Sequence, residues 1–323
     1  MGVFRKIAAG LSFTASVLSV GAAAAQTYPT KPVHIVVPFP PGGGVDVTAR
    51  ILAQALTQRI GQSFIVDNRA GASGTIGTEF VARSAPDGYT LLVGSQTTQS
   101  VVPAIQKVNY DGARDFIGVT EIARSPLLIV VNPSLPVNTV TDLINLAKAR
   151  PGQLTFGAAS SASPHLAGEL FKLMAKVDML FVPYKGEGPA IADAIGGQIS
   201  MVFSNLPAGL PQARGGRLRA IAVTSAQRVP TAPDIPTVAE SGLPEFEALT
   251  WFGLFAPAAT PREVITKVGA DSAAALNVSE TRDRMMQQGL FVTANTPDQF
   301  QDFLKKDLPR WAKIAKESGV ALQ

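Results

Sequence analysis

Short runs of β-branched residues alternate with amphipathic helical patterns from residue 33 onward. The first run, Val33–Val37, predicts a strand, and residues 45–60 predict a helix. That helix buries one face, formed by Ile51, Leu52, Ala55 and Leu56. Further strands are predicted at residues 64–66, 89–93, 154–156, 179–182, 199–203 and 218–223, and helices at 139–149, 166–176 and 189–195. This order is typical of βαβ units and predicts an α/β fold with a largely parallel sheet.

Two Thr-Pro pairs near the C-terminus indicate capped helices. In residues 260–263 and 296–299, Thr is predicted at the N-cap, Pro at the first helical position and Glu or Gln at the third. The threonine would accept a hydrogen bond from an amide that the helix leaves unpaired. We expect Pro309 to kink or interrupt the second of these helices, because proline removes a helical donor.

Two extended stretches divide the pattern into two lobes. Residues 116–131 form one long extended stretch, within which residues 121–131 are a candidate connection, and residues 246–257 are the other. If the chain crosses at both, residues 26–125 and 250–323 form the first lobe and residues 126–249 the second. A hinge would join them. The alternative is a single large doubly wound sheet, and the paired loops described below favour the hinge.

Residues 1–25 have the pattern of a secretory signal peptide. Arg5 and Lys6 form a positive n-region, an apolar run follows over residues 7–22, and residues 23–25 provide an A-x-A cleavage site. The alternative, an uncleaved anchor, is disfavoured because small and polar residues dilute the run. Cleavage would leave 323 − 25 = 298 residues and, without Arg5 and Lys6, lower the formal net charge from +4 to +2. Such a length suits two domains of about 150 residues each.

Composition excludes several classes of site. The chain has no cysteine and two histidines, His34 and His165, so thiolate nucleophiles, disulfides and cysteine-ligated metals are excluded. The densest basic clusters, near residues 214–219 and 305–310, lack the interleaved aromatics of a nucleic-acid surface. We therefore expect no metal, no cofactor and no nucleic acid. No GxSxG nucleophile elbow is present, so a secreted hydrolase is a less favoured alternative to a binding protein.

The strongest local signal for a binding site lies between the first strand and the first helix. Residues 38–46 have the sequence PFPPGGGVD, and three consecutive glycines allow the backbone to turn sharply and approach a ligand closely. The start of the helix adds unpaired N–H groups that carry partial positive charge. These features favour an anion at this loop. The alternative is a tight turn with no ligand.

A second loop occupies the equivalent place in the other lobe. Residues 157–165 have the sequence GAASSASPH, again after a strand and before a helix, and offer several hydroxyl donors. Both loops lie at carboxyl ends of strands, where open α/β sheets bind their ligands. Facing each other across a hinge, they would hold an anion through amides and hydroxyls, without a fixed cationic side chain.

Candidate binding residues follow from these loops and from the ends of other strands. Phe39 is predicted to wall the cleft, and Asp46 to orient the glycine loop or, if the ligand were an amino acid, to face its ammonium. His165 and Tyr184 each have an ordinary structural alternative. The predicted set is Phe39, Gly43, Gly44, Val45, Asp46, Ser95, Ala159, Ser160, Ser161, Ser163, His165, Tyr184 and Asn205.

Six segments, in order, resemble one family of receptors. They are residues 29–50 (PTKPVHIVVPFPPGGGVDVTAR), 66–77 (VDNRAGASGTIG), 182–190 (VPYKGEGPA), 218–224 (LRAIAVT), 233–243 (PDIPTVAESGL) and 251–257 (WFGLFAP). Over essentially its whole length the chain resembles the Bug-type receptors of the tripartite tricarboxylate transporter family. The resemblance implies a periplasmic solute-binding protein of Venus-flytrap form, with two Rossmann-like lobes, no catalytic activity and a small carboxylate held between the two loops.

The resemblance also implies a two-component membrane permease as partner of a monomeric receptor. A periplasmic sensor that presents its closed form to a signalling protein is the alternative. The family commonly has Thr at the position of Val45 and often glycines at residues 159–162, where this chain has alanines and serines. Losing a hydroxyl and gaining Cβ atoms should narrow or dehydrate the site, which disfavours polyhydroxylated or citrate-sized ligands.

Overall fold

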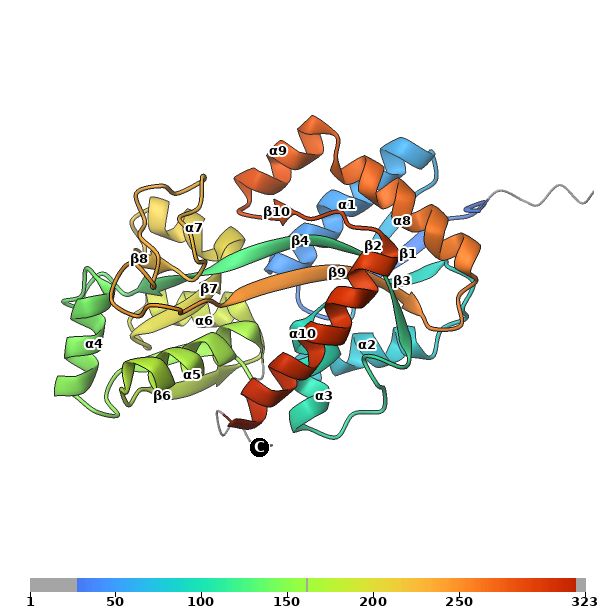
Figure 1. Ribbon diagram of the computed structural model, residues 1–323. Coiled ribbons are helices and arrows are strands. Elements are labelled where there is room, and N and C mark those ends of the chain that lie inside the picture. The colour runs from blue at the N-terminus through green and yellow to red at the C-terminus, as the bar shows by residue number, and fades with distance from the viewer. Residues whose placement is uncertain (1–27, 161, 318–323) are drawn as a thin grey trace, which may run out of the picture.

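Two α/β lobes connected by long strands make up the structure, a computed structural model that describes residues 28–160 and 162–317 (Figure 1). The predicted signal peptide, residues 1–25, and the predicted site residue Ser161 lie outside the described residues. Within the described ranges, no helix has the length and apolar character needed to cross a membrane.

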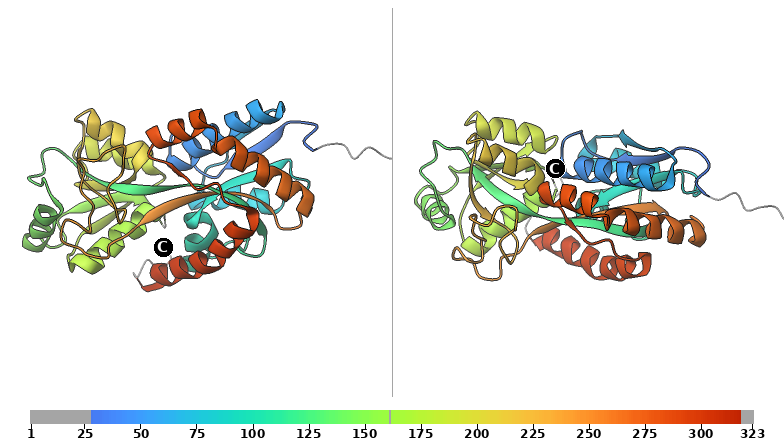
Figure 2. Two further views of the ribbon diagram at one scale, coloured as in Figure 1. Left: turned by 45° about the horizontal axis from the view of Figure 1, so that its top comes forward. Right: turned by 90° about the horizontal axis from the view of Figure 1, so that it is seen from above.

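The first lobe is built on a sheet with the strand order β2–β1–β3–β9–β4. β1 is parallel to β2 and β3, whereas β9 is antiparallel to both β3 and β4. Helices cover both faces, with α1 and α8 on one and α10 on the other (Figure 2). Its elements are β1 (Val33–Val37), α1 (Gly44–Ile60), β2 (Phe64–Asn68), η1 (Ala72–Gly74), α2 (Thr75–Ala82), β3 (Thr90–Ser95), η2 (Thr97–Val101), α3 (Val102–Ile105), β9 (Leu249–Pro257), α8 (Arg262–Leu276), α9 (Ser279–Gln287), β10 (Phe291–Val292) and α10 (Pro297–Glu317).

The second lobe has a smaller sheet in which β5 is parallel to both β6 and β7, and β7 pairs antiparallel with β4. β8 is antiparallel to β4 and completes this sheet. The elements are α4 (Val140–Ala149), β5 (Thr155–Ala159), α5 (Ser163–Ala175), β6 (Leu180–Tyr184), α6 (Glu187–Ile195), β7 (Met201–Asn205), α7 (Leu206–Arg214) and β8 (Arg219–Val223).

A single strand, β4 (Phe116–Val131), belongs to both sheets. Its first part, Phe116 to Pro126, pairs with β9, and its last part, Leu127 to Val131, pairs with β7 and β8. The chain passes back to the first lobe just before β9. At this point the amide of Ala248 still donates a hydrogen bond to the carbonyl oxygen of Thr224 in the second lobe. The predicted parallel pairing is therefore confirmed within each lobe for β1–β3 and β5–β7. It is wrong for the predicted strand β8, which pairs antiparallel with β4. The two connecting stretches, predicted only as extended, are the strands β4 and β9, and they also pair antiparallel.

Each lobe has its own core, as the sequence pattern predicts. In the first, Val33, Ile35 and Val37 of β1 pack with Leu52 and other apolar residues of α1. In the second, the fully buried ring of Phe156 lies between α5 and the strands around β5. Near-continuous apolar runs such as β1 are expected for strands that helices cover on both faces.

The two predicted capping threonines have different outcomes. Thr296 and Gln299 form a reciprocal capping box, with the Gln299 amide donating to Thr296 Oγ1 over 3.3 Å and the Thr296 amide donating to Gln299 Oε1 over 3.0 Å. The predicted cap at Thr260 is wrong. α8 begins one residue later than that cap requires, with Pro261 at the N-cap, and Thr260 Oγ1 is buried without a partner among the described residues.

α10 continues through Pro309, so the predicted interruption does not occur. The helix is anchored on both sides of the proline, because Phe300 and Leu304 before it and Trp311 and Ala315 after it are all buried. Burial of that one face outweighs the hydrogen bond that the proline removes. The pattern does not predict α2, α3, α7 or α9, whose buried faces are short.

Candidate functional site

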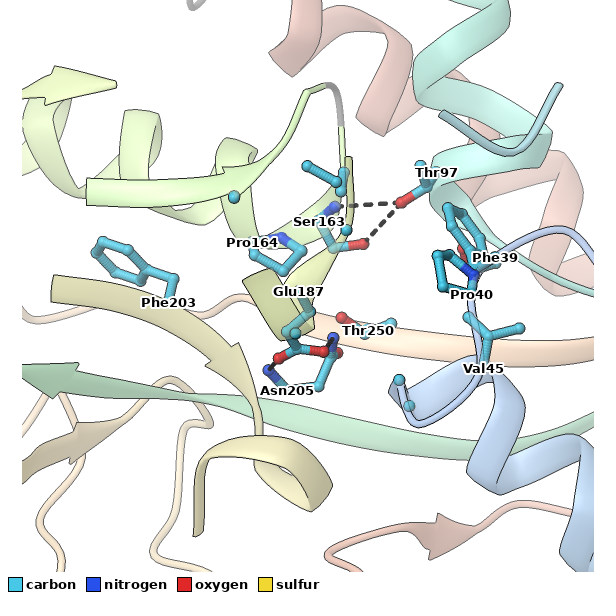
Figure 3. A pocket seen from close by; sticks show the side chains of 18 of the residues that line it. Phe39, Pro40, Val45, Thr97, Ser163, Pro164, Glu187, Phe203, Asn205 and Thr250 are labelled. Atoms are coloured by element: carbon cyan, nitrogen blue, oxygen red, sulfur yellow. Dashed lines mark hydrogen bonds between the residues drawn. The ribbon is translucent and has the colours of Figure 1, made fainter. Parts of the chain in front are cut away.

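A cavity of about 120 Å³ lies between the two lobes, walled by the glycine loop on one side and by the loop before α5 on the other (Figure 3). A cavity of this volume holds about ten non-hydrogen atoms, the number in a small organic acid. The lining residues are Phe39, Pro40, Pro41, Gly43, Gly44, Val45, Ser95, Thr97, Ala158, Ala159, Ala162, Ser163, Pro164, Gly186, Glu187, Gly188, Pro189, Val202, Phe203, Asn205, Thr250 and Phe252.

The glycine loop is held in shape by Asp46, which is buried beneath it and does not line the cavity. Asp46 accepts hydrogen bonds from the Gly42 amide at 2.9 Å, from Arg50 Nε and from Asn68 Nδ2. Burial opposes ionisation of Asp46, but these hydrogen bonds outweigh it and hold the pKa of the carboxyl below its usual value. Gly42 has a φ of +88°, a conformation that favours glycine, so the loop depends on both this residue and Asp46.

The opposite wall is the start of α5, and it contacts the first lobe directly. The Ser163 amide donates to Thr97 Oγ1 over 3.1 Å, and the two hydroxyls lie 3.2 Å apart. A second contact between the lobes brings Gly186 near the ring of Pro40: a Cβ placed on Gly186 would lie 3.6 Å from Pro40 Cγ. The two loops therefore face one shared cavity, and each contacts a residue of the opposite lobe beside it.

Several helices begin at the cavity wall. Residues at or beside the N-termini of α1, α5, α6 and α7 line it, namely Gly44, Ser163, Glu187 and Asn205. The first amides of a helix have no intrahelical acceptor and carry partial positive charge. No lysine, arginine or histidine of the described chain contributes to the lining. Positive potential in the cavity therefore comes from backbone dipoles.

Glu187, which the sequence reasoning missed, places a carboxyl group in this wall. Its Oε1 accepts from the Asn205 amide at 2.5 Å and from Ser204 Oγ at 2.7 Å, and its Oε2 accepts from Asn205 Nδ2 at 2.9 Å. Burial raises the pKa of Glu187, and the three hydrogen bonds oppose that rise. Its position after β6, at the first residue of α6, is the signal that could have identified it, by the same reasoning as for the two loops.

His165 lies in the first turn of α5 but is turned away from the cavity. Its ring stacks on Phe181 with 3.5 Å between centroids, and its Nε2 is 3.8 Å from Glu169 Oε1. Burial, with a smaller contribution from nearby Lys172, lowers the pKa of His165 to about 4. The structural alternative therefore describes this residue better than a ligand contact.

We expect stability to fall as the pH is lowered from about 6.5 to about 4, because the unfolded state then binds a proton that native His165 excludes. The lowered pKa corresponds to a loss of about 3 kcal/mol in the free energy of unfolding across that window. His165→Gln cannot titrate, so urea unfolding between pH 7.5 and 4 should show a shallower acid slope than in the wild type. Equal slopes would contradict the assignment.

The predicted site residues separate into two groups. Phe39, Gly43, Gly44, Val45, Ser95, Ala159, Ser163 and Asn205 are brought together around the cavity. Asp46, Ser160, His165 and Tyr184 are not part of its lining. Tyr184 instead donates its hydroxyl hydrogen to Asp193 Oδ2 of α6 over 2.7 Å, which draws its side chain to the helix.

Thr97, Thr250 and Phe252 also line the cavity without having been predicted. Thr97 follows β3 and begins η2, so its position resembles that of the predicted residues. Thr250 and Phe252 are two residues apart on β9, and alternate residues of a strand share one face. The sequence shows this alternation but not which face of β9 meets the other lobe.

Known proteins with similar sequences and structures identify the family to which this two-lobed chain belongs. The family model described as tripartite tricarboxylate transporter family receptor matches residues 48–320. The chain belongs to this receptor family. The resemblance carried by the six sequence motifs is therefore confirmed. Protein BugT of Bordetella pertussis (strain Tohama I), a relative of this receptor chain, is 39% identical over 302 residues, which are 93% of each protein.

Solved structures of similar proteins confirm the two-lobed fold of this family member. A protein of R. palustris solved with adipate is 38% identical, with a TM-score of 0.87 over 91% of this chain and 99% of that one. The periplasmic binding protein BugD is 35% identical, with a TM-score of 0.86 over 92% of this chain and 100% of that one. The predicted periplasmic-binding-protein fold is thus the fold of the chain.

Proposed function

We propose that the protein is a periplasmic receptor that captures a small organic carboxylate in the cavity between its lobes. The observation that carries this proposal is the shared cavity itself. Four helices, α1, α5, α6 and α7, begin at its wall, and no cationic side chain of the described residues lines it. Helix N-termini are suited to carboxylates, since their unpaired amides donate to the oxygens. The adipate in the R. palustris relative is an acid of the size that this cavity accommodates.

The energetics are sufficient without a cation. A hydrogen bond to a charged group contributes about 1.5–3 kcal/mol, and each helix terminus adds up to about 2 kcal/mol in a partly buried site. Three such bonds together with two helix termini, each near the upper end of its range, leave the roughly −8 kcal/mol of a micromolar complex after an association cost of about 5 kcal/mol. In this proposal the amides of Gly43, Gly44 and Val45 meet the carboxylate from one lobe. From the other lobe the donor is the Ser163 hydroxyl, because the Ser163 amide already donates to Thr97 Oγ1.

The proposal includes no catalytic step. Ser163 of the second loop lines the cavity, and its hydroxyl lies beside Thr97 Oγ1, whereas His165 stacks on Phe181. A serine nucleophile next to a histidine base is thus not formed by these residues.

The lobe boundaries remain part of the same proposal. The first lobe consists of residues 26–125 and 250–323, and the second of residues 126–249. The two lobes would rotate relative to each other about two connections, one near the change of partner in β4 and one near Ala248. Export through the predicted signal peptide and delivery of the ligand, by a monomeric receptor, to a two-component permease complete the proposal.

A thermal-shift screen of residues 26–323 tests it. Mono-, di- and tricarboxylates, amino acids and aromatic acids are added in turn, and calorimetry measures the affinity of any that act. A ligand at about 100 times its Kd should stabilise the fold by about 2.7 kcal/mol, which raises Tm by about 5 °C. Stabilisation by none of these acids would contradict the proposed function.

A further inference from the structure

Three hydrogen-bond acceptors gather at one end of the cavity. Asn205 Oδ1 and Thr250 Oγ1 are buried, and neither has a partner among the described residues. Thr250 is only 4% exposed, and in Figure 3 its hydroxyl points toward Glu187 and Asn205. Glu187 Oε2 accepts one hydrogen bond, from Asn205 Nδ2, and has capacity for another. Buried polar atoms are rarely left unpaired, so this group indicates a ligand that brings donors.

The orientation of the Asn205 amide follows from its neighbour. Both carboxyl oxygens of Glu187 accept hydrogen bonds, so the NH2 of Asn205 faces Oε2, and Oδ1 must point elsewhere. The Ser204 hydroxyl and the Asn205 main-chain amide both donate to Glu187 Oε1, so each group of the described chain that is bonded to this carboxylate is a donor. The remaining surface that Glu187 and Asn205 present to the cavity consists of acceptors.

No cationic side chain among the described residues balances Glu187. Its described surroundings contribute hydrogen bonds from Ser204 and Asn205 and no charged partner, and the described lining contains no lysine, arginine or histidine. A negative charge in such a place is costly unless something positive enters beside it.

We propose that Glu187, Asn205 and Thr250 form a subsite for the ammonium group of an amino acid whose carboxylate lies at the N-termini of α1 and α5. This inference rests on the proposed function and names the class of carboxylate. An ammonium has three N–H donors, one for each acceptor, and its charge pairs with that of Glu187. Asp46 cannot take this role, because it lies outside the lining and is already paired with Arg50.

The same subsite discriminates against a dicarboxylate. A second carboxylate at this end would lie against Glu187 and would bring no donor to Asn205 Oδ1. Like charges placed together are a common means of rejecting the wrong ligand. Glu187 is therefore the residue that would distinguish a zwitterion from a dianion of equal length.

The first test compares three acids at each chain length from three to six carbons, with the wild-type protein at pH 8. These are the ω-amino acid, the dicarboxylate with the same number of carbons and the unsubstituted monocarboxylate. At the length that fits, calorimetry should show the ω-amino acid binding at least tenfold more tightly than either of the others.

The second test removes the charge of Glu187 with little change in shape. Glu187→Gln should weaken binding of the ω-amino acid by about ten- to hundredfold, the range for a charged hydrogen bond, and should strengthen binding of the dicarboxylate. Glu263→Gln is the matched control, because Glu263 also lies in the first turn of a helix but is exposed and outside the cavity. It should leave both affinities unchanged.

The outcomes separate the two proposals. Failure of all three acids to bind the wild-type protein, together with a negative screen, would overturn the proposed function. Tighter binding of the dicarboxylate to the wild type, with a ratio that Glu187→Gln does not change, would overturn the ammonium subsite alone. Circular dichroism and ligand-free Tm establish that the variant is folded, and the wild-type comparison needs no variant.

Discussion

Gly44→Val should lower ligand affinity by about a hundredfold, which corresponds to about 2.8 kcal/mol. A Cβ on Gly44 would lie 3.1 Å from Phe252 Cζ and 3.5 Å from Asn205 Cβ, so the valine side chain would enter the space between the lobes. It would separate the carboxylate from the amides at the start of α1, and one or two charged hydrogen bonds would be lost. Calorimetry with the best ligand from the screen measures the change.

The ligand-free fold should tolerate the same substitution. Gly44 begins α1 and has no positive φ, and the nearest clash is with the edge of one ring, which must shift by a few tenths of an ångström. The matched control is Gly196→Val, at the exposed end of α6, where a Cβ meets no atom closer than 3.5 Å. Wild-type affinity in Gly44→Val, with its Tm also unchanged, would remove the glycine loop from the binding site.

The alternation of strands and helices could be predicted because each element has its own hydrophobic period. The glycine loop could also be predicted, because three glycines between an apolar strand and an amphipathic helix are typical of a sharp turn at the carboxyl end of a sheet. The sequence pattern places the lobe boundary between residues 125 and 126, but it does not predict that β4 pairs with both sheets. The neighbours of a strand are set by distant segments of the chain, and the apolar run of β4 does not identify them.

Which side chains of the two loops face the cavity could not be predicted from the sequence, for a geometric reason. Successive residues of a helix are rotated by about 100°, so residues two apart point in nearly opposite directions. Ser163 faces the cavity, and His165, two positions later, faces Phe181. The adjacent residues Val45 and Asp46 also diverge, one lining the cavity and the other bonded beneath the loop to Gly42.

Trp251→Ala should lower the free energy of unfolding by about 3–5 kcal/mol, the largest stability effect that we predict. Trp251 is buried on the face of β9 opposite Thr250 and Phe252, and its ring lies about 6 Å, centroid to centroid, from each of Phe255, Phe300 and Phe303. Its Nε1–H donates to Asp307 Oδ2 of α10 over 2.6 Å. The alanine would leave both a cavity among these rings and a buried acceptor without its donor.

Trp251→Phe divides that loss into its two parts. Phenylalanine keeps an aromatic ring in the cluster but cannot donate to Asp307, so we expect a smaller decrease of about 1–3 kcal/mol. Burial already raises the pKa of Asp307, and the bond from Trp251 opposes that rise, so its removal should raise this pKa further. Urea unfolding followed by circular dichroism measures both variants, because Trp311 also contributes to fluorescence. If Trp251→Ala and Trp251→Phe both lay within about 0.5 kcal/mol of the wild type, β9 and α10 would not depend on this contact.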